Sequence, residues 1–205
     1  MKHEIIPVGP LSTNCHLVFD ENKRELFIID PGAEPEKIIR AAKKYDFASA
    51  RILLTHAHID HISGCGQVAG ELGVAEVELS PADIPMYNSE DNHFFPYFPR
   101  AVNLPPGVPF RPMAIGTILE LPGHTQGGSG ILFDDGESKF LLSGDTIFNC
   151  SIGRTDLPGG NYGMLISSIR TQILTLPEDL EIFPGHGTST TVGNERVNNP
   201  FLSMR

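Results

Sequence analysis

Four apolar, strand-like runs in this sequence each end in side chains that can bind a metal ion. The run RILLTHAH ends at His56 and His58, TILELPGH at His124, KFLLSGD at Asp145, and LEIFPGH at His186. Ligand sites in open sheets lie just beyond the carboxyl ends of the strands. If the four strands share an edge, their ends bring these side chains together, so we expect a metal centre there.

The first run leads into the densest cluster of candidate ligands, THAHIDH. In extended chain, residues i and i+2 point the same way, so His56 and His58 can face one ion. Asp60 and His61 follow where the chain turns into a helix, and can face a second position. A single histidine after a strand is ordinarily a surface or hydrogen-bonded residue, but three histidines within six residues are not explained that way.

The number of candidate ligands favours two ions. Five histidines and two aspartates make seven, whereas a catalytic zinc ion takes three protein ligands and one open position. Paired ions lie about 3.5–4 Å apart and can share a hydroxide. The assignment is His56, His58 and His124 on one ion, Asp60, His61 and His186 on the other, and Asp145 between them. We expect two divalent ions, with zinc in both positions and iron or manganese as alternatives, because nitrogen and oxygen ligands accept all three.

Strand-like and helical patterns alternate along the chain, which predicts an α/β fold in a single domain, residues 1–205. Strands are expected at 3–8, 15–20, 25–30, 50–56, 117–123, 130–135, 139–145 and 180–186. Helices are expected at 34–45, 61–73 and 162–176, with a short closing helix in 193–205. The segment 91–112 holds six prolines and many aromatic residues, and we expect a long ordered loop that covers part of the molecule.

Charge and composition limit the classes of partner that this chain is expected to bind. The net charge is −10, from 15 basic and 25 acidic residues, which disfavours nucleic acid and anionic membranes as partners. There is no run of about 18 apolar residues, as a membrane span needs, and no secretory signal is visible. Three well-separated cysteines do not form a disulfide framework and suit the cytoplasm. We therefore expect a cytoplasmic protein with a small-molecule substrate.

The motifs carry a family resemblance. THAHIDH matches the T-H-x-H-x-D-H signature of the metallo-β-lactamase superfamily, and PGHTQG, SGDTIF and PGHG match its remaining metal motifs in order. The resemblance spans nearly the whole chain. It implies a four-layer αββα sandwich with the metal site at one edge of the two sheets. It also suggests that Asp30 orients a metal-bound histidine, although Asp30 could instead be a simple turn residue before Pro31.

Within that superfamily, the chain most resembles the short bacterial hydrolases related to type II glyoxalase. GDTIFNCSIGRTDLPGG, TTVGNERVNNPF and VGPLSTNCHLV carry this likeness. Full-length type II glyoxalases have an added C-terminal domain that holds glutathione. Only 19 residues follow His186 here, so that domain is expected to be absent. The stretch IGRTD also resembles the persulfide dioxygenase branch, which uses one iron.

The expected activity is hydrolysis of thioesters of the S-lactoylglutathione type by a hydroxide held between the two ions. Asp145 would bridge the ions and Asp60 would orient the hydroxide. A thiol leaves readily because its pKa is about 8.5, so no strong general acid is needed. The alternatives are a mono-iron persulfide dioxygenase that uses His56, His124 and Asp145, and a non-catalytic binding protein on the same fold.

Two further side chains have open interpretations. Arg154 could hold an anionic substrate group, although an ordinary surface arginine fits equally well. Cys65 lies on the same predicted helix face as His61 and is expected to be a small buried filler. His3, His16 and His93 have no ligand neighbours in the sequence and are interpreted as incidental.

Overall fold

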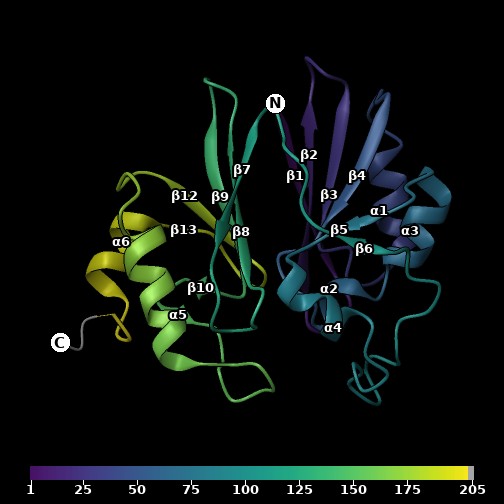
Figure 1. The fold of residues 1–205 in the computed structure, drawn as a ribbon. Coiled ribbons are helices and arrows are strands. Elements are labelled where there is room, and N and C mark those ends of the chain that lie inside the picture. Colours follow the sequence, from purple (N-terminus) through teal and green to yellow (C-terminus); the bar gives the residue numbers. More distant parts are fainter. Residues whose placement is uncertain (203–205) are drawn as a thin grey trace. The chain divides into compact units, whose positions relative to one another are not determined.

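The computed structural model describes residues 1–202 and divides into two compact units, Met1–Arg111 and Pro112–Arg205. Figure 1 colours the first unit from purple to teal and the second from teal-green to yellow. Each unit has its own main sheet and its own hydrophobic cluster. Within residues 1–202, no helix is both long enough and apolar enough to cross a membrane.

The first unit contains a mixed six-stranded sheet in the order β1-β2-β3-β4-β5-β6. Its strands are β1 (Lys2–Val8), β2 (Thr13–Asp20), β3 (Glu25–Ile29), β4 (Ser49–Leu53), β5 (Val77–Glu78) and β6 (Gly107–Val108). The pairs β1–β2 and β2–β3 are antiparallel, because short turns join them. The pairs β3–β4, β4–β5 and β5–β6 are parallel, because longer crossover connections join these strands.

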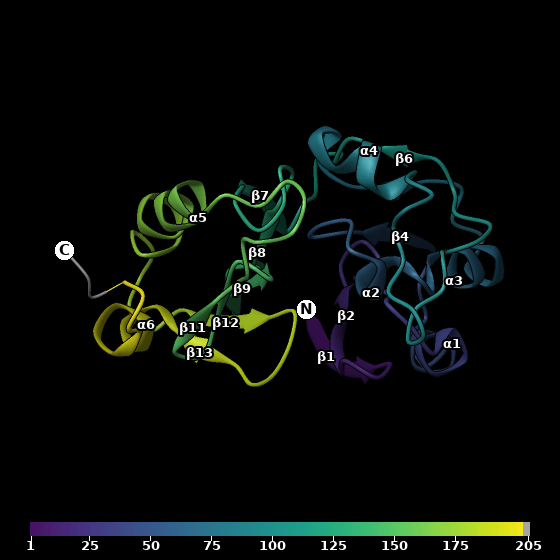
Figure 2. The same cartoon turned by 90° about the horizontal axis from the view of Figure 1, so that it is seen from below.

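The crossovers of the first unit carry its helices. These are α1 (Pro35–Ala42), α2 (Ile59–Ile62), α3 (Cys65–Leu72), the 3-10 turn η1 (Pro81–Asp83) and α4 (Ile84–Tyr87). Helices α1 and α3 lie side by side along one face of the sheet (Figures 1 and 2). Ile38 from α1, Ile52 from β4 and Val68 from α3 are fully buried in their shared core. Gly73 ends α3 as predicted, in a left-handed conformation with φ of 71°.

The single helix predicted at 61–73 is wrong, because the chain breaks it into α2 and α3. Gly64 lies at the break, and its N–H donates to Pro31 O at 2.8 Å. A Cβ atom on Gly64 would lie only 2.6 Å from that same oxygen. The glycine is therefore needed for close approach to the segment after β3. Strand β4 also ends earlier than predicted, at Leu53, so His56 lies beyond the strand in irregular chain.

The second unit contains a five-stranded sheet in the order β13-β12-β9-β8-β7. Its strands are β7 (Gly116–Glu120), β8 (Ser129–Asp134), β9 (Lys139–Gly144), β12 (Glu181–Pro184) and β13 (Thr190–Thr191), and a separate hairpin joins β10 (Ile147–Phe148) to β11 (Ser151–Ile152). Strand β12 is parallel to β9. Strand β8 is antiparallel to both β7 and β9. Strands β7, β9 and β12 therefore run in the same direction. Their carboxyl ends therefore share one edge.

The helices of the second unit cover one face of its sheet. Helix α5 (Tyr162–Ser168) continues into a π-helical turn (Ile169–Ile173), and α6 (Val192–Asn198) follows β13. Both helices lie on the same side of β12 and β9 (Figures 1 and 2). Leu165, Ile169 and Val192 are buried against Leu141 and Ile182 of the sheet. The helix predicted at 162–176 thus begins as α5 and ends in the wider π-helical turn. The helix predicted within 193–205 corresponds to α6, and residues 203–205 lie outside the described part of the chain.

The predicted mixture of strands and helices is confirmed, but the four ligand-bearing runs do not all lie in one sheet. Strands β7, β9 and β12 share an edge in the second unit, whereas β4 belongs to the first. The segment 91–112 is largely loop, as expected, and contains only the short strand β6. The pattern did not predict the short elements β5, β6, α4, β10 and β11. A two-residue strand has too few positions to show alternation.

Candidate metal centre

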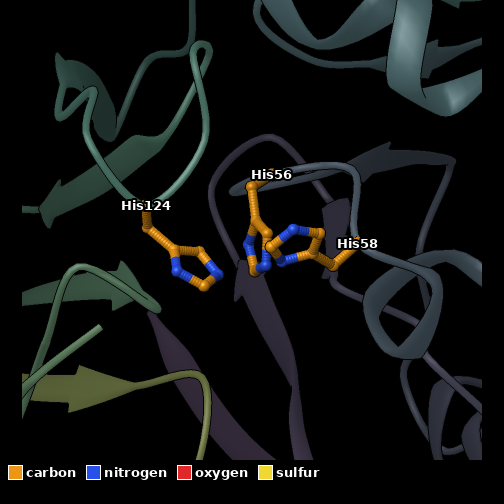
Figure 3. Close-up of side chains that lie close together, drawn as sticks. All are labelled: His56, His58 and His124. Atoms are coloured by element: carbon orange, nitrogen blue, oxygen red, sulfur yellow. The ribbon is translucent and has the colours of Figure 1, made fainter. Parts of the chain in front are cut away.

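The first unit presents four of the predicted ligands on the segment that follows β4. His56 and His61 are almost completely buried, at 2% and 0% exposure, and Asp60 is 9% exposed. The rings of His56 and His58 meet edge to face with centroids 4.8 Å apart (Figure 3). The rings of His56 and His61 are 4.1 Å apart. The motif therefore folds back on itself at the start of α2, which gathers its imidazoles.

Asp30 contacts Thr55 and His61, and these contacts determine which ring nitrogen of His56 and of His61 carries the proton. Its Oδ2 lies 3.0 Å from His61 Nδ1 and accepts a hydrogen bond of 2.6 Å from the Thr55 hydroxyl. Its Oδ1 accepts from the Thr55 N–H at 2.8 Å. A carboxylate only accepts, so the His61 proton is on Nδ1 and the lone pair on Nε2. Thr55 Oγ1 lies 3.1 Å from His56 Nδ1. Since its hydrogen is given to Asp30, it accepts from His56, which leaves the His56 Nε2 lone pair for a metal.

The Asp60 carboxylate is also oriented by a threonine hydroxyl. Its Oδ2 accepts a hydrogen bond from the buried Thr13 hydroxyl at 3.2 Å. The same oxygen lies 3.6 Å from His61 Nε2. The contact with β2 therefore turns the carboxylate toward the histidine nitrogen that carries the lone pair.

The second unit brings His124, Asp145 and His186 together at the shared edge of its sheet. His124 follows β7 (Figure 3), Asp145 follows β9, and His186 follows β12. Asp145 Oδ2 lies 3.6 Å from His124 Nε2 and 3.5 Å from His186 Nε2. His124 Nδ1 lies 2.8 Å from the carbonyl oxygen of Arg154. Because a carbonyl only accepts, His124 also carries its proton on Nδ1 and its lone pair on Nε2.

Close backbone packing keeps this group in place. Gly123 adopts φ of 136°, and a Cβ atom on it would lie 2.2 Å from Leu165 N at the start of α5. A Cβ atom on Gly153 would lie 1.9 Å from Asp145 O and 3.2 Å from His124 Nδ1. Any larger residue at either position would displace a ligand-bearing segment, so only glycine, which has no side chain, fits at these two positions.

A buried carboxylate anchors the hairpin that follows Asp145. Glu195 of α6 is fully buried and accepts hydrogen bonds from the Cys150 N–H at 3.0 and 3.1 Å. It also accepts from the hydroxyl of Thr190 at 2.6 Å and the amide of Asn199 at 2.7 Å. Cys150 is in a left-handed conformation with φ of 56°. The C-terminal helix thus fixes the turn between β10 and β11.

The residues fit divalent metal ions by geometry and by donor chemistry. The pairs described above are separated by 3.5–3.6 Å, which is longer than a good hydrogen bond. Two tetrahedral ligands about 2.1 Å from one ion lie about 3.4 Å apart, close to these separations. Within the first unit, ligand atoms of Asp30, His56 and His61 also lie within 4.8 Å of one another. Imidazole and carboxylate together suit zinc, iron or manganese.

Other predicted site residues have different surroundings. The Arg154 guanidinium pairs with Asp156 through two hydrogen bonds of 2.7 and 2.8 Å, and its carbonyl contacts His124. Its role in substrate binding stays a prediction.

Cys65 is fully buried, and burial raises the pKa of its thiol, with the nearby Asp30 charge adding to the shift. A protonated buried thiol is a packing residue, as predicted.

Sequence reasoning missed the residues that hold the ligands. Thr55 stands directly before His56 in the THAHIDH motif, so its hydroxyl could have been suspected. Thr13 and the Arg154 carbonyl could not, because their partners lie 47 and 30 residues away. Such contacts depend on the fold and leave no local pattern.

Comparison with known proteins gives four strong similarities: one to a family profile, one to a relative and two to solved structures. A sequence profile described as "Metallo-beta-lactamase superfamily" matches residues 8–186. The hydroxyacylglutathione hydrolase GloC of Haemophilus influenzae is 38% identical over 222 residues, covering 100% of both chains. Two solved structures each give a TM-score of 0.85. One is the B3 metallo-beta-lactamase BLEG-1, 32% identical over 99% of this chain and 100% of that one. The other is TTHA1623 in a di-iron-bound form, 34% identical over 97% of this chain and 100% of that one.

Proposed function

Because the chain belongs to the metallo-β-lactamase superfamily of metallo-hydrolases and has its fold, we propose that it hydrolyses small acyl thioesters of the glutathione type. The observation that carries this proposal is the similarity to a hydroxyacylglutathione hydrolase along the full length of both chains. The superfamily binds divalent metals, and the di-iron form of TTHA1623 supports two ions here.

The proposed ligand set combines the two groups described above. The first ion takes His56, His58 and His124, the second takes Asp60, His61 and His186, and Asp145 is shared. Two observations support this assignment. In three histidines, Nδ1 faces an oxygen that fixes the tautomer and leaves Nε2 for an ion. In each unit, a carboxylate oxygen lies at ligand-to-ligand distance from a histidine Nε2.

Ions held by these residues would lower the pKa of a bound water molecule toward about 7 and would polarise the substrate carbonyl. The protein's own residues then position the reacting groups. Asp60, turned by Thr13, can accept a hydrogen bond from the attacking water and orient it. Asp60 and Asp145 both face histidine nitrogens, so neither is placed to give a proton to a leaving group. This suits a thiolate, whose parent thiol has a pKa of about 8.5, better than an amide nitrogen.

The direct test compares substrates on the metal-loaded protein. We expect thiol release from S-lactoylglutathione with a kcat/KM at least about 100-fold above that for a chromogenic β-lactam, a difference of about 2.7 kcal/mol. His124→Ala should abolish thiol release, whereas exposed His93→Ala should leave it unchanged. Oxygen uptake with glutathione persulfide, without thioester cleavage, would contradict the proposal and favour the mono-iron dioxygenase.

A second candidate function is β-lactam hydrolysis, favoured by the 32% identity to BLEG-1 over nearly the whole chain. It would require a proton donor for the departing nitrogen, or a substrate whose ring strain makes such a donor unnecessary. The same assay separates the two candidates, since a kcat/KM for the β-lactam equal to or above that for the thioester would favour this function.

A further inference from the structure

We infer that Asp83 and Asn92 form a clamp on the peptide backbone of Ala57 and thereby position His56 and His58 for one metal ion. All five residues belong to the first unit. The inference rests on the proposed metal centre and extends it to two side chains that lie far from the metal motifs in the sequence.

Within residues 1–202, the peptide groups around Ala57 have no strand partner. Strand β4 has ended at Leu53, and α2 begins only at Ile59. Ala57 is nevertheless fully buried. A buried backbone N–H or C=O without a partner is strongly unfavourable, so both groups of this residue need a hydrogen bond from elsewhere.

Asp83 supplies the acceptor. Its side chain is 1% exposed, and its Oδ2 accepts a hydrogen bond from the Ala57 N–H at 3.1 Å. Asp83 lies at the junction of η1 and α4. Tyr87 fixes this short helix, since it is 2% exposed and donates to Pro105 O at 2.9 Å. The carboxylate therefore projects from a well-anchored element.

Asn92 supplies the donor on the other side of the same residue. Its Nδ2 donates to Ala57 O at 2.8 Å and to Met86 O at 3.1 Å. One amide thus joins the peptide between the two histidines to the end of α4. This contact also gives a role to the start of the 91–112 loop.

Together the two side chains hold the N–H and the C=O of the residue between His56 and His58. The two peptide planes on either side of Ala57 determine the directions in which both imidazoles leave the backbone. Losing either contact would let those planes rotate, which would misplace the His56 and His58 donors while leaving Asp60 and His61 tied to Thr13 and Asp30. The clamp therefore acts selectively on one ion.

The test measures metal affinity directly, so that it does not depend on the substrate. Zinc affinities are determined by competition with a chromophoric chelator, and the d–d absorption of the cobalt-loaded protein reports ligand geometry. Asn92→Asp is the main variant, because it keeps the shape but points an acceptor at two carbonyl oxygens. Asp83→Ala removes the other contact, and Asp83→Asn keeps an oxygen that can accept from Ala57. Asn88→Ala and Asp91→Ala are matched controls, exposed and close in sequence.

We expect Asn92→Asp and Asp83→Ala to weaken one of two zinc equivalents by about 10–100-fold and to change the cobalt spectrum, as loss of supporting contacts around metal ligands does. Asp83→Asn should restore most of the affinity, and both controls should match the wild type. Unchanged zinc affinities in Asn92→Asp, or an equal loss at both equivalents, would overturn the clamp. If the wild-type protein binds zinc as proposed but cleaves no thioester, the proposed function fails while this inference stands.

Discussion

Asp30 shows what a single residue contributes here. Its φ of 52° is left-handed, which costs a non-glycine residue about 1–2 kcal/mol. In return, its carboxylate reaches the Thr55 N–H, the Thr55 hydroxyl and His61 Nδ1 together. A residue with ordinary backbone angles would direct its side chain elsewhere, so the strain is retained where it serves the candidate metal centre.

Asp30→Asn should impair metal binding without removing any ligand. Oδ1 must continue to accept from the Thr55 N–H, so the new NH₂ group takes the place of Oδ2 and faces two donors. His61 can then avoid a donor–donor contact only by moving its proton to Nε2, which blocks metal binding there. We expect zinc affinity to fall about 10–100-fold, measured by chelator competition. Asp46→Asn, at an exposed aspartate of the same unit, is the control. Wild-type affinity in Asp30→Asn would show that the carboxylate does not set this tautomer.

Asp145→Asn should have a larger effect, because it changes a proposed ligand shared by two ions. Its carboxylate lies close to Nε2 of both His124 and His186, and the amide removes the negative charge between them. We expect metal content to fall below two ions per chain and turnover to fall by at least about 100-fold. Metal analysis after gel filtration measures the first, and thiol release the second. Two bound ions and full activity would contradict the shared-ligand assignment.

At the scale of elements, a buried ion network joins the parallel strands of the first unit. Glu78 of β5 is fully buried and accepts from Arg51 of β4 at 2.7 and 2.6 Å. It also accepts from the Arg111 side chain at 3.0 and 2.6 Å. Burial alone raises the pKa of Glu78, but the hydrogen bonds from the two arginines outweigh it, so the pKa is lowered overall. Because β5 has only two residues, this network does much to keep it in the sheet.

Glu78→Ala should lower the free energy of unfolding by about 3–5 kcal/mol, because it removes the buried carboxylate that pairs with Arg51 and leaves this arginine the longer contact of 3.7 Å with Glu25. Urea unfolding at pH 7 measures this. The matched control is the neighbouring Glu76→Gln, whose carboxylate is 45% exposed near Arg111, and whose loss should cost about 0–1 kcal/mol.

The same network predicts a pH dependence. A carboxyl group with a lowered pKa stabilises the fold above its unfolded pKa of about 4.3, and this contribution is lost as the pH falls through the folded value. The wild-type protein should therefore lose stability below about pH 4.3 more steeply than Glu78→Gln. Parallel pH curves for the two proteins would contradict the charged state assigned to Glu78.

At the scale of the whole molecule, each unit has a separate core and carries only part of the proposed ligand set. The first supplies four of the seven residues and the second supplies three. Ions that take ligands from both would couple the stabilities of the two units. Ligand binding adds about 2.7 kcal/mol at a free concentration 100 times Kd.

Metal removal should therefore lower Tm and reduce cooperativity. For a chain of this size, we expect a decrease of about 5–11 °C relative to the zinc-loaded protein. Differential scanning calorimetry should show one transition with zinc and a broadened or double transition after chelation. Addition of magnesium to the zinc-free protein is the control, since magnesium prefers octahedral oxygen ligands and should not restore Tm. One unchanged transition in both states would argue against shared ions.

The sequence indicated the candidate ligands but not the residues that support them, for a physical reason. His56, His58, Asp60 and His61 lie in one short motif, and the remaining ligands follow strands whose apolar runs are visible locally. Asp83 and Asn92 contact Ala57 from 26 and 35 residues away, through backbone groups whose identity the sequence does not specify. The break at Gly64 likewise depends on Pro31, which only the folded chain brings near. Local patterns thus indicate candidate ligands, whereas the long-range contacts that support them can be seen only in the folded chain.

The anchoring of the β10–β11 turn by Glu195 has a consequence for the timing of synthesis. Cys150 and its carboxylate partner are 45 residues apart. At about 5–20 residues per second, the turn emerges from the ribosome about 2–9 s before the residue that fixes it. During that interval, the backbone next to Asp145 lacks its final anchor, even though β7, β8 and β9 have already been made. The second unit therefore acquires this anchor only after residue 195 has been made, and a ribosome that pauses before codon 195 prolongs the period in which the turn after Asp145 lacks its anchor.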